Sequence, residues 1–169
     1  METNQLTETS NALISSAQLL EHWQGHRRLT RRTIEIYPED KLFTYSIGGM
    51  RPFSELIAEL LDIAEGGILG MAKDSWNSLS NSRHVSGNFP KTKQEILEAW
   101  DKVTQQIDEL WPEIPDSRFQ EVVLAFGAYE GPVYSTFLYF VDNEIHHRGQ
   151  AYVYLRSLGI TPPPFWERN

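Results

Sequence analysis

The sequence predicts an all-α protein, a four-helix bundle with long connecting loops, formed by a single domain over residues 1–169. Four segments of roughly 20 residues or more carry apolar residues at helical spacing, which is the pattern of such a bundle. Prolines, glycines and capping residues bound these segments. The length of 169 residues and the 40% hydrophobic content suit one domain with one core.

The first helix is expected from about Ser10 to Ile36, because Pro38 prevents easy continuation. The second is expected to begin at Pro52, since proline suits the first turn of a helix. Gly66 and Gly67 either weaken this helix or permit close packing. The two predicted inner faces comprise Leu13, Ile14, Ala17, Leu20, Trp23, Gln24, Arg27, Arg31 and Ile34, then Phe53, Leu56, Ile57, Leu60, Leu61, Ala64, Ile68 and Met71.

The third helix is predicted most directly, because Thr92 and Glu95 have the spacing of a capping box. The asparagine- and serine-rich segment 74–90 before it is expected to be a loop. Residues 116–131 fit either a strand or a turn of helix. The fourth helix should start after Gly131-Pro132 and end at Gly159.

Charge and composition exclude several classes of protein. The net charge of −8 argues against a nucleic-acid or anionic-membrane surface, although Arg27, Arg28, Arg31 and Arg32 form a local basic cluster. The chain has no cysteine, so it has neither disulfides nor thiolate metal ligands. The polar N-terminus lacks the pattern of a signal peptide, and no apolar run approaches the ~20 residues of a membrane span. These features favour a cytoplasmic protein.

The fourth helix carries an unusual polar cluster between apolar residues. At ~100° per residue, Glu144 and Arg148 fall inside its apolar arc, His147 at the edge and Asn143 slightly outside. His146 points well away. Buried charges need partners. One interpretation is structural, with Glu144 and Arg148 paired at i, i+4. The other is a metal site between facing helices, for which helix spacing alone is a weak signal.

The run NEIHHRGQAYVYLRSLGITPP resembles the final-helix signature of the DinB family, also called DinB/YfiT-like, typically His-x-x-His-His-Arg-Gly-Gln. The segments EHWQGHRRLTRRTIE and MRPFSELIAELLDIAE look like the first two helices of that family. The resemblance covers most of the chain, and residues 112–131 match only in layout. It implies a four-helix bundle. Many members bind a divalent metal through three histidines, and some are thiol-dependent S-transferases.

Carried over residue by residue, the resemblance implies the metal ligands Glu59, Asn143 and His147, with Glu144 and Arg148 around them. Only His147 retains the family histidine. Three imidazoles suit zinc or nickel, whereas this mixed set favours harder ions such as manganese or iron(II). Alternatively, the site has lost its metal, and Glu59 pairs with Arg148 or another cation. A helix-one pair, His22 and His26, is a weaker metal candidate.

Two functions remain open from the sequence. The first is a DinB-like metal-dependent enzyme acting on a small molecule or low-molecular-weight thiol, with no catalytic residue assigned. The second is a non-catalytic bundle with a degenerate site, serving as a binding or dimerisation module. The resemblance also implies a homodimer built on bundle helices.

Overall fold

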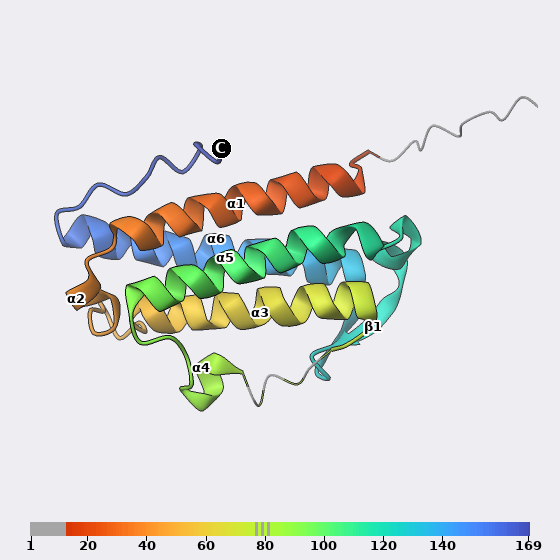
Figure 1. Cartoon of the computed structure of the whole chain (residues 1–169), viewed down its shortest axis with the longest axis horizontal. Coiled ribbons are helices and arrows are strands. Elements are labelled where there is room, and N and C mark those ends of the chain that lie inside the picture. The colour runs from red at the N-terminus through yellow and green to blue at the C-terminus, as the bar shows by residue number, and fades with distance from the viewer. Residues whose placement is uncertain (1–12, 77, 79, 81) are drawn as a thin grey trace, which may run out of the picture.

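The computed structural model describes residues 13–76, 78, 80 and 82–169 and shows a mainly α-helical bundle (Figure 1). Its four long helices are α1 (Ser16–Ile36), α3 (Phe53–Lys73), α5 (Lys93–Leu110) and α6 (Val133–Ser157). Short elements complete it: α2 (Glu39–Leu42), α4 (Arg83–Ser86), the 3-10 helices η2 (Trp111–Glu113) and η3 (Asp116–Gln120), and the strands β1 (Val122–Ala125) and β2 (Tyr129–Pro132). The predicted fold class is confirmed.

The long helices form a ring in the order α1, α5, α3, α6, because each packs against its two neighbours in that order. Two connections, α1 to α3 and α5 to α6, therefore cross a diagonal of the bundle. The core between the helices is rich in aromatic side chains. Among them, Trp23, Trp111 and Phe137 contact one another with ring centroids 5.3–6.2 Å apart. None of the helices in the described ranges has the length and apolar character to cross a membrane.

The ends of the helices follow the local sequence closely. Thr92 and Glu95 form the predicted capping box at the start of α5. A second capping box, made by Ser15 and Gln18, starts α1 later than expected. Leu13 is 96% exposed and lies outside the helix, so its predicted core position is wrong. The expected residues 10–12 of this helix lie outside the described part of the chain.

The segments between the helices are more structured than the sequence indicates. One turn of helix, α4, interrupts the expected loop of residues 74–90. The ambiguous stretch 116–131 contains both predicted alternatives, first the 3-10 helix η3 and then strand β1. Strands β1 and β2 pair antiparallel with Ala125 opposite Tyr129, forming a hairpin beside one end of α3 (Figure 1). This hairpin packs against α6 and helps to form the pocket described below.

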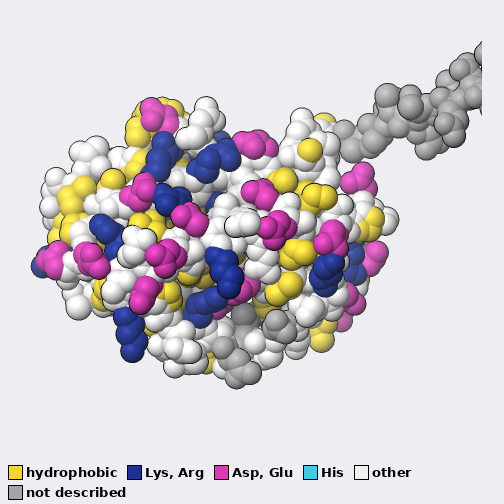
Figure 2. Space-filling view, viewed as in Figure 1, with side chains coloured by type: hydrophobic (Ala, Val, Ile, Leu, Met, Phe, Trp, Pro, Cys, Tyr) yellow, Lys and Arg dark blue, Asp and Glu magenta, His cyan; other side chains and the backbone are white. Residues whose placement is uncertain are grey.

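Opposite charges alternate over the face that carries α1, α5 and α3 (Figure 2). The four arginines of α1 illustrate this mixing. Arg31 pairs with Asp101 at 2.6 Å, and Arg28 pairs with Glu21 at 2.5 Å. Arg27 is buried and stacks over the Trp100 ring at 4.0 Å. Two arginines of the local basic cluster, Arg28 and Arg31, are therefore paired with acidic neighbours.

Candidate functional site

The predicted ligands Glu59, Asn143 and His147 meet between α3 and α6. The Asn143 side-chain amide donates a hydrogen bond to Glu59 Oε1 at 3.1 Å, and His147 Nε2 lies 3.1 Å from the same oxygen. Asn143 and His147 stand one turn apart on α6, so both face the one carboxylate on α3. Both are also buried, with 8% and 6% of their surface exposed.

A cation that sequence reasoning did not single out completes this group. Arg51, in the loop before α3, donates to Glu59 Oε2 at 2.6 Å. Both oxygens of Glu59 are therefore engaged, one by Arg51 and the other by α6. We call Arg51, Glu59, Asn143 and His147 the Glu59 network. The sequence left open that Glu59 pairs with Arg148 or with another cation. In the structure Glu59 does pair with a cation, which is Arg51 and not Arg148.

These contacts keep Glu59 ionised. The hydrogen bond with His147 holds the pKa of Glu59 well below its usual range, against the opposing effect of burial, with further lowering by Arg51 and Asn143. A general base works best when its pKa lies near the operating pH. Glu59 is therefore a poor general base and a good fixed hydrogen-bond acceptor.

The ring of His147 is held on both sides. Its Nδ1 lies 2.7 Å from Gln150 Oε1, while its Nε2 faces Glu59. The Gln150 amide nitrogen in turn donates to Met50 Sδ at 3.5 Å. Both ring nitrogens therefore lie against oxygen atoms of the protein itself.

The donor set does not fit the metal ion that the family resemblance implies. The Glu59 charge is already balanced by Arg51, so a divalent cation would meet little net attraction. Asn143 presents its nitrogen, not its oxygen, to Glu59. The described residues also contain no group of three or more His, Cys, Asp or Glu side chains placed to hold a metal.

The structure places Glu144 and Arg148 away from the Glu59 network, against α1. Glu144 accepts a hydrogen bond from Thr30 Oγ1 at 2.6 Å and lies 3.7 Å from Arg148 and 4.0 Å from Arg27. Arg148 donates to Thr30 Oγ1 and to the backbone oxygen of His26. Glu144 and Arg148 therefore belong to a buried ion-pair cluster between α1 and α6. This agrees with the interpretation of the sequence in which the two residues pair with each other. The role expected for them around Glu59 has no support in these contacts.

His26 belongs to the same cluster and is not free to bind a metal with His22. Its Nδ1 lies 2.9 Å from Arg148 Nη2, and its Nε2 lies 3.0 Å from Arg168 Nη1. Burial, followed by the positive charges of Arg148, His22 and Arg168, lowers the pKa of His26 to about 3. The folded protein therefore keeps this ring neutral at pH values where an exposed histidine is charged.

We expect the His26→Gln variant to lose part of the acid sensitivity of the wild type. As the pH falls below the ordinary histidine value of 6.5, the unfolded chain binds a proton that the folded protein does not accept until about pH 3. The free energy of unfolding of the wild type should therefore fall between these values, and the slope should be shallower in His26→Gln. Urea unfolding at a series of pH values measures it. The exposed His146→Gln serves as control, and equal slopes in all three proteins would contradict the assignment.

A pocket of about 430 Å³ adjoins the Glu59 network. It lies between α3, α6 and the β1–β2 hairpin, and its size is that of sites for small organic molecules. Glu59 lines it, as does Tyr139, whose hydroxyl lies 3.4 Å from the Asn143 amide nitrogen. Most of its remaining lining is apolar or aromatic. We call this space the hairpin pocket.

Phe126 at the tip of the hairpin lines this pocket in a strained conformation. Its φ of +55° lies in the left-handed region, which bulky residues rarely adopt. Its ring is buried and packs edge-on against Trp76 and Phe140, at 5.7 and 6.1 Å between centroids. Such strain costs on the order of 1–3 kcal/mol and occurs preferentially at functional sites. Sequence reasoning missed this residue, although the turn-forming Gly127 after it is a signal for a hairpin.

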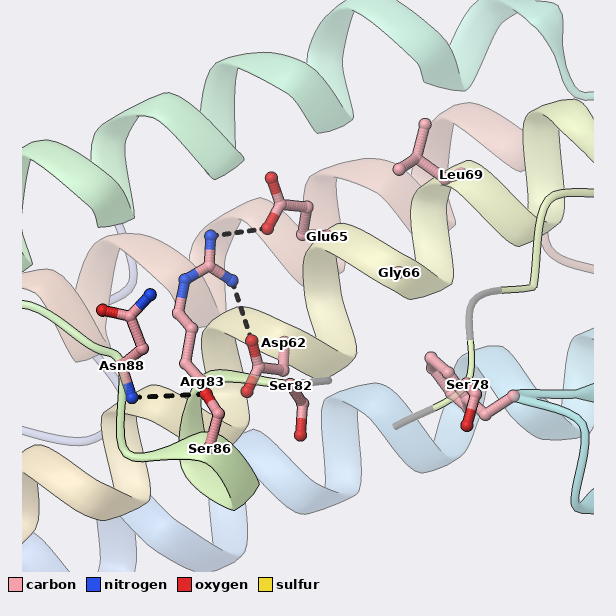
Figure 3. A pocket seen from close by; sticks show the side chains of 10 residues that line it. Asp62, Glu65, Gly66, Leu69, Ser78, Ser82, Arg83, Ser86 and Asn88 are labelled. Carbon is pink, nitrogen blue, oxygen red and sulfur yellow. Dashed lines mark hydrogen bonds and ion pairs between the residues drawn. The ribbon is translucent and has the colours of Figure 1, made fainter. Parts of the chain in front are cut away.

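A second, more polar pocket of about 560 Å³ also has Phe126 in its lining. Figure 3 shows the Arg83 guanidinium between the carboxylates of Asp62 and Glu65, at 2.8 and 2.6 Å. Asp62 also accepts one hydrogen bond from the backbone N–H of His84 and contacts its ring. These contacts fasten α4 onto α3. They satisfy the charges of that pocket internally and make it the weaker candidate.

Comparison with known proteins agrees with the fold and the motif. The model of the DinB family matches residues 1–168. Two solved structures are similar in fold, each with a TM-score of 0.69. A DinB-like protein from Bacillus cereus ATCC 10987 is 18% identical over 88% of this chain and 95% of its own. A DinB-like protein from Bacillus subtilis is 19% identical over 89% of this chain and 97% of its own. No curated protein is similar enough in sequence to count as a match. The match over nearly the whole chain shows that the protein belongs to the DinB family.

Proposed function

We propose that this DinB-family protein binds a small organic molecule in the hairpin pocket without a metal ion. The observation that carries the proposal is the position of the Glu59 network. It supplies an ionised, fully hydrogen-bonded carboxylate at the wall of an otherwise largely apolar cavity of about 430 Å³. Few fixed polar groups in an apolar cavity are the usual composition of a small-molecule site.

The competing function is a metal-dependent transferase with Glu59, Asn143 and His147 as ligands. It requires an ion to displace Arg51 from Glu59, or to bind beside it, and the Asn143 amide to rotate. Both changes cost hydrogen bonds that the protein makes already. The binding function needs neither change, and for this reason we favour it.

Metal titration of untagged protein tests this choice. We expect no stoichiometric binding of zinc, nickel, manganese or iron(II) by calorimetry, and no change in melting temperature with a chelator. His147→Ala should lower the free energy of unfolding by about 1–3 kcal/mol, because it leaves Glu59 and Gln150 short of a partner. That loss should be the same with and without metal, since stabilisation by a ligand follows its occupancy.

His146→Ala is the matched control, because His146 is the exposed neighbour of His147 on α6. It should leave the stability of the protein nearly unchanged. Stoichiometric metal binding to the wild type that disappears in His147→Ala, but persists in His146→Ala, would favour the metal-dependent transferase.

We also propose that the protein forms a homodimer through the outer face of α6. This face exposes Tyr134, Leu138, Ile145 and Val153, each at 40% or more. Gly149 lies on the same face, and a Cβ atom there would meet nothing within 4 Å. An exposed glycine inside a helix costs about 1 kcal/mol relative to alanine and gains nothing in the monomer. A closely approaching second helix would explain it.

The charges on this face are self-complementary. Asp142 and Arg156 lie equally far from Gly149 along α6, on opposite sides of it, as do Ile145 and Val153. If two copies of α6 cross antiparallel at Gly149, symmetry brings Asp142 of each copy to Arg156 of the other. Within the described chain, neither Asp142 nor Arg156 has an ion pair that competes with this arrangement.

Charge reversal tests the dimer by light scattering. Asp142→Arg and Arg156→Asp should each weaken association by about tenfold or more, because each places like charges opposite one another. The double variant restores opposite charges and should recover the dimer. A wild type that is monomeric at micromolar concentration, or a double variant as weak as either single one, would refute the arrangement.

A further inference from the structure

The hairpin pocket has one unpaired charge in its described lining, and it is negative. Its lining includes two carboxylates, Glu59 and Glu130, and neither a lysine nor an arginine among the described residues. The nearby cations are already held by other groups: Arg51 bonds Glu59 Oε2, and Arg83 bonds Asp62 and Glu65. The lining histidine, His84, directs its Nδ1 to Asp62 at 2.9 Å. A bound anion would therefore find no free positive partner in the wall.

Glu130 is the carboxylate left for a ligand. It lies in β2, where it is exposed and makes no ion pair or side-chain hydrogen bond within the described chain. Glu59 lies across the pocket on α3, where Arg51 balances its charge, so Glu130 carries the attraction for a cation. Burial, and then the charge of Glu59, raises the pKa of the Tyr139 hydroxyl, which therefore stays protonated at neutral pH.

Aromatic rings supply the second half of the site. Phe126, Tyr129, Tyr139 and Phe140 all line the pocket. Tyr129 and Tyr139 are 63% and 55% exposed, so much of their surface is not covered by the protein itself. Aromatic rings attract cations through their negative faces, and rings combined with carboxylates form the usual recognition site for organic ammonium groups. Ser135, Thr136 and the tyrosines add hydroxyl oxygens that can accept N–H hydrogen bonds.

We propose that the hairpin pocket selects a protonated organic amine with an aryl or alkyl body. The ammonium group lies near Glu130 and the tyrosines, and the apolar body lies against Phe126 and Phe140. This proposal rests on the proposed function, because it names the class of molecule that the same pocket binds. The net charge of −8 on the whole chain also favours the approach of a cation over that of an anion.

Three compounds with one body and different charges test the proposal: 2-phenylethylamine, 2-phenylethanol and 3-phenylpropionate. Calorimetry at neutral pH in the presence of a chelator should rank the amine first, the alcohol second and the carboxylate last. We expect at least about tenfold between amine and carboxylate, the factor that corresponds to roughly 1.4 kcal/mol. A neutral fluorescent probe, N-phenyl-1-naphthylamine, should bind saturably and be displaced by the amine.

Single substitutions test whether the order of affinities of the three compounds arises from the hairpin pocket. Glu130→Gln should weaken binding of the amine about fivefold and leave binding of the alcohol unchanged, as expected for loss of a partly exposed ion pair. Tyr129→Leu should weaken binding of the amine about threefold more than it weakens binding of the alcohol, because the cation–π contact is lost. Glu98→Gln on α5 removes the same charge far from the lining and is the control. Ser135→Trp fills the pocket and should abolish binding of the probe and of all three compounds.

The possible failures are distinguishable. If the carboxylate binds as tightly as the amine, or if Glu130→Gln and Glu98→Gln behave alike, the amine class is wrong while a small-molecule pocket remains. If neither the probe nor any of the three compounds binds, or if Ser135→Trp binds them as the wild type does, the proposed function itself is overturned together with the amine class.

Discussion

Replacement of Glu144 by alanine is expected to destabilise the protein by about 3–5 kcal/mol, because it leaves buried positive charges without their acid. Glu144 is 2% exposed and lies within 4.0 Å of both Arg27 and Arg148. Burial already lowers the pKa of Arg27 to about 10, against the opposing effect of Glu144. Among the described residues, Glu144 is the one carboxylate within ion-pair distance of these two guanidiniums. Chemical denaturation at neutral pH measures the loss.

Two further variants show that the effect comes from burial. Asp101→Ala removes the acid of the exposed Arg31–Asp101 pair and should cost about 1 kcal/mol or less. The triple variant Arg27→Met, Glu144→Met, Arg148→Met removes the charges together and should be more stable than Glu144→Ala alone. If Glu144→Ala costs no more than Asp101→Ala, the ion-pair cluster does not hold α1 to α6.

Substitution of Gly67 by valine is expected to cost about 3 kcal/mol through overpacking. A Cβ atom at Gly67 would lie 2.4 Å from Phe140 Cε2, well inside van der Waals contact. The Phe140 ring is 2% exposed, and it lies near Trp23 and Phe126, with centroids 6.2 and 6.1 Å away. It therefore has little room to move. Of the two interpretations of this glycine, close packing is confirmed.

A double-mutant cycle with Phe140→Leu checks that the clash is with this ring. Phe140→Leu alone should cost about 1–2 kcal/mol, because it removes buried apolar surface. If the two side chains clash, the double variant should lose less stability than the sum of the single losses. Additive losses would mean that Gly67→Val acts through helix propensity or another neighbour.

The sequence determined the elements whose signals are local. Capping residues, prolines and a period of 3.6 residues depend on neighbours within one or two turns of the chain. They located α3, α5 and α6 to within a few residues. They also placed Glu144, His147 and Arg148 at or near the core, where all three are buried. Asn143 was expected slightly outside the apolar arc and is buried as well. The late start of α1 was itself readable, because Ser15 and Gln18 have the spacing of a capping box.

The resemblance to the family motif selected Glu59, Asn143 and His147, which contact one another in the structure, but their hydrogen bonding depends on a residue outside the motif. Arg51 lies in a loop, and nothing in its local sequence marks it as the partner of Glu59. The hairpin that forms the pocket was equally uncertain, since four-residue strands carry too little periodicity to be told from a turn of helix. Pairing between β1 and β2 exists only once the chain has turned at Phe126 and Gly127.

The sequence by itself therefore determined that this protein is a helical bundle of the DinB family with polar residues buried in its last helix. Only the tertiary structure decided what those residues do. Glu144 and Arg148 face α1, whereas Asn143 and His147 face Glu59 on α3. Helical periodicity tells which side of a helix is buried, but it contains no information about which neighbour covers each part of that side. That choice follows from the order α1, α5, α3, α6 around the bundle, which is fixed by packing between distant segments.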